Sequence, residues 1–96
     1  MKYLTIDASL HGTGIRDSYK GGYIDPKDLC LNPNIIKQIN DWLIKYENEH
    51  YNGYSNQKLI NDLDNEGKEI ALKIKKELLE VKIEYFSDAR MTKEMI

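Results

Sequence analysis

The sequence has little of the material from which disulfide-bonded, membrane-spanning or nucleic-acid-binding proteins are built. It contains one cysteine, Cys30, so an intramolecular disulfide framework is excluded and a reducing cytoplasm is expected. No apolar run approaches the roughly 20 residues that cross a bilayer, and the amino-terminal MKYLTIDASL has no signal-peptide core. A formal net charge of −2 argues against a basic clamp for nucleic acid. We therefore expect a cytoplasmic protein that binds neither membrane nor nucleic acid.

Motifs for cofactors, metals and catalysis are also missing. The GTG of residues 12–14 follows an expected strand, but no G-x-G-x-x-G opens a helix and no G-K-[ST] is present. The two histidines and the cysteine match no zinc spacing. Ser9, His11 and Asp17 are the residue types of a nucleophilic triad, but their closeness in sequence does not create triad geometry. We predict that the protein is not an enzyme and holds no cofactor or metal.

The chain does contain the pattern of one small α/β domain spanning residues 1–96. Residues 3–8 (YLTIDA) alternate between apolar and polar, which is typical of a half-buried strand, and residues 81–86 (VKIEYF) repeat the alternation. We expect the strands from the two ends of the chain to form the edges of a small sheet. The final RMTKEMI is predicted to be a frayed tail.

Two helices are predicted between these strands. Asn32-Pro33 has the residue types of a helix start, and the apolar spacing that follows continues to about Glu49. A second apolar stripe runs from Ile60 to Leu78, with Ser55 as its candidate cap, and it includes Gly67, where we expect close approach of the first helix. The resulting β-α-α-β order is an α+β fold in which a helical hairpin packs on the sheet. The predicted core is Leu4, Ile6, Ile35, Ile39, Trp42, Leu43, Ile60, Leu63, Ile70, Ile74, Val81 and Ile83.

A glycine-rich crossing links the first strand to the first helix. Residues 8–26 hold four of the six glycines, and the ordinary interpretation is that these are turn glycines. IRDSY and YID flank KGG, so this segment is either a short hairpin or an irregular loop. Asp25-Pro26 predicts a short helical turn that ends at Leu29.

Tyrosines and acids suggest surfaces for a partner. Of seven tyrosines, four lie in the crossing and in the turn between the helices; loop tyrosines either anchor protein interfaces or cover the ends of a small core. Residues 47–69 contain six acids and two lysines, which would steer a basic partner, although a solvated helix face is the ordinary explanation. The candidate partner-binding residues are Arg16, Tyr19, Tyr23, Glu47, Glu49, Tyr51, Tyr54, Asp62 and Asp64.

The motifs GTGIRD, GGYIDP, DW-x-x-x-Y, LDNEG and EYFSDA together resemble a set of small, uncharacterised bacterial proteins of about this length. That set often has an acidic residue where His11 stands here. The resemblance covers nearly the whole chain and implies no activity; only size and class suggest a likeness to immunity proteins.

Two functional hypotheses follow. The first is a protein-binding module, most concretely an immunity protein or inhibitor that covers the active site of a toxin such as a basic nuclease. The alternative is a small-ligand-binding or enzymatic domain in which His11, Arg16 and Asp17 surround an anionic ligand.

Overall fold

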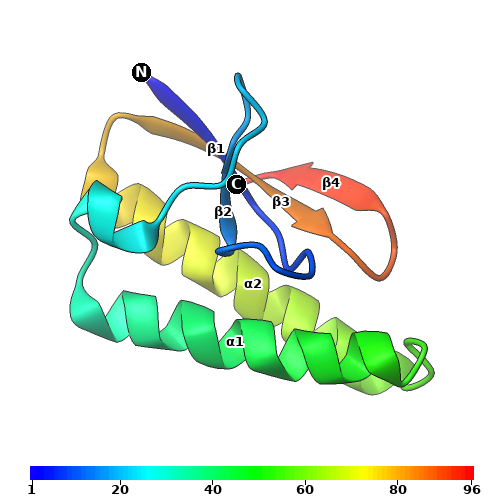
Figure 1. Cartoon of the computed structure of the whole chain (residues 1–96). Helices are drawn as coiled ribbons and strands as arrows, with labels where there is room; N and C mark the ends of the chain where they lie inside the picture. The colour runs from blue at the N-terminus through cyan, green and yellow to red at the C-terminus, as the bar shows by residue number, and fades with distance from the viewer.

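The two strands expected from the sequence are the central pair of a four-stranded mixed sheet. The computed structural model describes all 96 residues, and its sheet has the strand order β2-β1-β3-β4. The strands are β1 (Lys2–Ile6), β2 (Ile15–Asp17), β3 (Val81–Ser87) and β4 (Thr92–Met95). The helices are the 3-10 helix η1 (Pro26–Leu29), α1 (Pro33–Tyr51) and α2 (Gln57–Leu78). The predicted α+β fold with its helical hairpin is confirmed (Figure 1).

The helical hairpin determines how the central strands pair. The hairpin brings the chain back to the end of the sheet at which β1 starts. The next strand, β3, therefore runs parallel to β1, with Leu4 opposite Ile83 and Ile6 opposite Tyr85. β2 and β4 add antiparallel strands on the outside. The prediction that the strands now labelled β1 and β3 form the edges of the sheet is therefore wrong, because β2 and β4 lie outside them.

The predicted frayed tail is also wrong, because residues 92–95 form β4 on β3. All four side chains of β4 are exposed. The strand has no apolar face for a sequence pattern to reveal, and backbone pairing with β3 holds it in place. The terminal carbonyl of Ile96 also accepts a hydrogen bond from Lys75 Nζ at 2.7 Å.

The glycine-rich crossing contains a hairpin, which resolves the alternative left open by the sequence. After β2 the chain turns through KGG and comes back, so that Gly22 O accepts from Asp17 N at 2.8 Å and Ile24 N donates to Ile15 O at 2.9 Å. Gly21 has φ 82° at the turn, a conformation that glycine adopts freely. We call residues 17–23 the tongue.

Local cap chemistry sets the helix boundaries. The side chains of Asp25 and Asn32 accept backbone N–H groups at the starts of η1 and α1, each ahead of a proline, as predicted. α1 ends at Tyr51 rather than near Glu49. The cap of α2 is Asn56, not its neighbour Ser55.

The core lies between the sheet and the helical hairpin. The predicted core residues are buried except for Ile35 and Leu43, which are partly buried and pack against it. Trp42 is fully buried and donates from Nε1 to Leu63 O at 2.8 Å. An added Cβ at Gly67 would collide with the ring of Tyr85 and come within 2.8 Å of Trp42 Cζ2. The glycine thus allows close approach of the sheet as well as of the first helix.

Both long helices cover the same face of the sheet, and the opposite face has no helix over it (Figure 1). Because side chains alternate along a strand, Leu4 and Ile6 enter the core while their neighbours project to the other side. We call that side the outer face; it carries Tyr3 and Thr5 from β1, Asp7 directly after β1, and Lys82, Glu84 and Phe86 from β3. Neither long helix combines the length and apolarity needed to cross a membrane.

Candidate protein-interaction surface

The centre of the outer face is a buried hydrogen-bonded network. Thr5 Oγ1 donates its one proton to Glu84 Oε1 at 2.8 Å. In the 2.5 Å hydrogen bond between Thr5 and Ser18, Ser18 Oγ is therefore the donor. Tyr3 OH donates to Glu84 Oε2 at 3.0 Å, and this bond raises the pKa of the Tyr3 phenol. The Ser18 hydroxyl thus ties the tongue to β1, and the hydroxyls of Thr5 and Tyr3 tie β1 to β3. A hollow of about 250 Å³ remains between the tongue and the sheet.

Arg16 connects the tongue to a buried carboxylate. Its Nε lies 3.3 Å from Asp7 Oδ2, an ion pair in which the N–H is not aimed at the oxygen. Asp7 is only 1% exposed; burial raises the pKa of its carboxyl, and the nearby Arg16 partly offsets that rise. The guanidinium also donates from Nη2 to Tyr23 OH at 2.5 Å, with its central carbon 4.8 Å from the centre of the tyrosine ring. These contacts give both residues a structural role.

Tyr19 is the most exposed aromatic residue of the tongue. It is 70% exposed, and its ring meets Tyr3 edge-on with 5.5 Å between ring centres. Lys82 Nζ lies 5.0 Å from the centre of the Tyr3 ring. Asp17 accepts the backbone N–H groups of Tyr19 and Lys20 at 2.9 and 3.2 Å, which shapes the tongue beneath the exposed ring. Of the predicted residues, the structure therefore brings Arg16 and Tyr23 into contact, whereas Tyr19 contacts Tyr3.

The other predicted tyrosines lie at the turn between α1 and α2. Tyr54 is half-buried, with its ring 6.1 Å from that of Tyr46 and its hydroxyl 3.1 Å from His50 Nδ1, so it covers the end of the core. Tyr51 is 70% exposed and contacts His50 edge-on. Glu49 is only 6% exposed and accepts a long hydrogen bond from Asn52 Nδ2 at 3.4 Å.

The acidic segment does not form one continuous surface. Glu66 pairs with Lys45 at 2.6 Å, and Glu49 and Asp64 both lie inside the fold instead of on a recognition surface. Only Glu47 and Asp62, of the predicted acids, are exposed. The spacing contained a signal for Asp64, because it follows Ile60 by four residues and precedes Gly67 by three, which places it on the apolar stripe.

Asp64 instead accepts four hydrogen bonds in the interior. Its donors are Tyr46 OH at 2.8 Å, Tyr85 OH at 2.6 Å, Ser87 Oγ at 2.8 Å and Arg90 Nη1 at 2.8 Å. Burial raises the pKa of Tyr46 to about 12, so its hydroxyl stays protonated and able to donate. The network joins α1, α2, β3 and the turn before β4.

Sequence reasoning did not predict that two further carboxylates, Asp7 and Asp88, lie together just after the carboxyl ends of the parallel strands. Ser9 links them: its N–H donates to Asp7 Oδ1 at 3.4 Å and its hydroxyl to Asp88 Oδ1 at 3.2 Å. Burial raises the pKa of both carboxyls. The sequence contained a signal for this pair, because each aspartate directly follows an apolar strand. The carboxyl ends of such strands are where open α/β sheets bind ligands.

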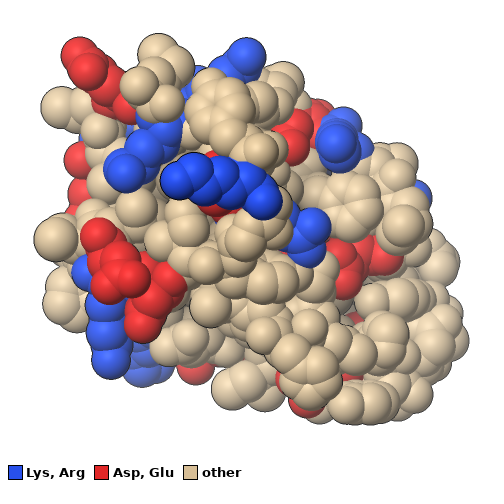
Figure 2. Space-filling view, turned by 45° about the horizontal axis from the view of Figure 1, so that its top comes forward, with Lys and Arg blue, Asp and Glu red and all other residues tan.

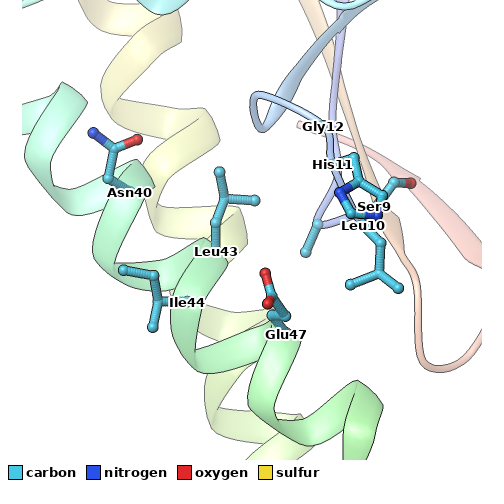
Figure 3. A pocket seen from close by; sticks show the side chains of 9 residues that line it. Ser9, Leu10, His11, Gly12, Asn40, Leu43, Ile44 and Glu47 are labelled. Carbon is cyan, nitrogen blue, oxygen red and sulfur yellow. The ribbon is translucent and has the colours of Figure 1, made fainter.

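The residues of the ligand-binding alternative do not meet at one site. His11 lines a hollow against α1 (Figure 3), whereas Arg16 and Asp17 line the hollow beneath the tongue. Arg16 is paired with Asp7, and Asp17 accepts backbone N–H groups of the tongue. No group of three or more histidine, cysteine or acidic side chains is placed to hold a metal ion.

Fold and surface together define an α+β protein whose sheet carries helices on one face and an aromatic tongue on the other. No family model, curated protein or solved structure matches the chain.

Proposed function

We propose that the protein is a protein-binding module that recognises its partner with the tongue and the outer face. The observation that carries the proposal is Tyr19, a largely exposed aromatic side chain held in place by the ring of Tyr3. A rigid tyrosine offers a large contact area and loses little conformational entropy on binding, which is why tyrosines dominate many interfaces. Its neighbour Tyr23 is likewise exposed and held by Arg16.

In its most concrete form the module is an inhibitor of the immunity type, which neutralises a toxin by covering the toxin's active site. The support for this form is the small size of the domain and its preformed recognition surface. A purely acidic surface for a basic nuclease has less support, because Glu49 and Asp64 are buried and Glu66 is paired. Figure 2 shows basic and acidic side chains close to one another on this face, with a broad uncharged area beside them. Aromatic contacts, more than charge, would then supply the affinity.

Two tyrosines of equal exposure allow a controlled test. Tyr19 and Tyr51 are both 70% exposed and each contacts one aromatic neighbour, but they belong to the tongue and to the helix turn respectively. The tagged protein would be used to isolate a partner from its source cells, and the affinity of the purified pair measured by calorimetry. Tyr19→Ala should weaken binding by about 30-fold, or about 2 kcal/mol, as expected for a hot spot. Tyr51→Ala should bind as the wild type does.

The inhibitor form requires one more measurement. The partner's activity should fall to background at an equimolar amount of wild-type protein and should recover with Tyr19→Ala. Both variants should melt at the wild-type temperature, because neither ring is buried. Unchanged binding by Tyr19→Ala, or greater loss with Tyr51→Ala, would contradict the proposed surface.

A further inference from the structure

A second hollow lies between the loop after β1 and the helix α1 (Figure 3). Its volume is about 320 Å³, at the small end of the range for ligand sites. One wall is the loop of residues 8–12, which contributes Ala8 and Leu10. The other wall is α1, which contributes Leu43, Ile44 and Glu47. Four aliphatic side chains thus line the hollow, together with Ser9, His11, Gly12, Asn40 and one acid, Glu47.

The chain just after this loop packs closely on the helix. Gly14 has φ 93°, and an added Cβ there would come within 2.7 Å of Ile39 Cγ2 on α1. His11 also adopts a positive φ of 65° where the loop turns. Ile44 remains 61% exposed beside this packed region. The aliphatic wall is thus preformed but not covered by any other part of the chain.

Glu47 is the feature that indicates what the hollow accepts. Its carboxylate points toward the loop (Figure 3) and forms no hydrogen bond or salt bridge. Two other acids of the helices pair with cations, Glu66 with Lys45 at 2.6 Å and Asp41 with Lys37 at 3.1 Å, whereas the exposed Asp62 and Glu69 do not, and neither of these lines the hollow. Apart from His11, Glu47 is the only ionisable side chain in the lining. An unpaired negative charge therefore stands beside an aliphatic wall.

We propose that this hollow binds a basic side chain, arginine or lysine, presented by the partner protein. The stem of such a side chain is aliphatic and its head is cationic, so the stem would lie on Leu10, Leu43 and Ile44 while the head reaches Glu47. That this side chain belongs to a protein partner rests on the proposed function. The chemistry of the hollow can be tested without that partner.

The test uses two amino-acid amides on the isotope-labelled full chain. N-acetyl-arginine amide carries the cation, and N-acetyl-citrulline amide has nearly the same shape without the charge; N-acetyl-lysine amide is run alongside. We expect saturable NMR shifts at the amides of Leu10, Leu43, Ile44 and Glu47 with the cationic probes, with dissociation constants on the order of millimolar. Citrulline should bind at least fivefold more weakly.

Variants of two exposed acids complete the design. Glu47→Gln should lower the affinity for the arginine probe to that of citrulline, whereas Glu69→Gln, on the other helix, should keep wild-type affinity. The inference is overturned if neither cationic probe gives saturable shifts there, if citrulline binds as well as arginine, or if Glu47→Gln changes nothing. The proposed function fails separately, when Tyr19→Ala retains the partner, whatever the probes do.

Discussion

Replacing Asp64 by asparagine would test whether its buried carboxylate organises the end of the fold. The side chain is 8% exposed and accepts hydrogen bonds from two tyrosines, a serine and an arginine. Asparagine keeps the shape but replaces one acceptor oxygen by a donor NH₂ group. That group would face Ser87 and Arg90 if it takes the place of Oδ2, and arginine has no acceptor to offer it.

The expected loss follows from these contacts. A hydrogen bond to a charged group contributes about 1.5–3 kcal/mol, and breaking a buried ion pair costs about 3–5 kcal/mol. Because Arg90 is one-third exposed, water can replace part of its interaction. We therefore expect Asp64→Asn to lower the free energy of unfolding by about 3 kcal/mol, a large share of the roughly 5–15 kcal/mol typical of a domain.

Urea denaturation at neutral pH measures this directly, provided that the slope of the transition stays constant. Asp62→Asn is the matched control, since Asp62 is on the same helix two residues earlier and exposed; it should change stability by no more than about 0.5 kcal/mol. Equal midpoints for the two variants would show that the Asp64 network does not hold the fold together, and the reasoning would be wrong.

Three further predictions follow from buried contacts. Gly67→Ala should destabilise the fold by about 1–3 kcal/mol in thermal melts despite alanine's higher helix propensity, because the new Cβ would collide with Tyr85 and Trp42. Asn65→Ala, at an exposed position of the same helix, should not destabilise the fold. A higher melting temperature for Gly67→Ala would contradict this packing. Burial raises the pKa of Asp7 above its ordinary 3.8, so the folded state holds that proton more tightly than the unfolded chain. The wild type should therefore lose stability relative to Asp7→Asn as the pH rises from about 4 through the raised pKa, and a constant difference would refute this. Arg16→Ala should lower the free energy of unfolding by about 1–2 kcal/mol, because it leaves the Asp7 carboxylate without its cation. In a double-mutant cycle with Asp7→Asn, Arg16→Ala should lower the free energy of unfolding by less than it does in the wild type, and an equal effect in both backgrounds would show no coupling.

The recognition surface was only partly predictable. Arg16 contacts Tyr23, seven residues later, whereas Tyr19 contacts Tyr3 and is 70% exposed, as expected of an interface anchor. Sequence alone could not decide whether Arg16 binds a partner or pairs with an aspartate, because its buried partner Asp7 follows β1 and approaches Arg16 only when β2 pairs with β1. The leading hypothesis had placed Asp64 on the surface, although its spacing matched the apolar stripe, because an acid is seldom buried without partners. Those partners come from α1, β3 and the turn after it.

The sequence by itself determined the elements whose causes are local. Alternation along β1 and β3, the apolar stripes of α1 and α2, and the caps Asp25 and Asn32 each depend on residues a few positions apart. Tertiary structure alone decided that β1 is central and β4 is ordered, and which acids are buried. Thr5 and Glu84, for example, are 79 residues apart and meet only because the helical hairpin lays β3 beside β1. Strand pairing and burial depend on which distant segments come together, and no local pattern encodes that.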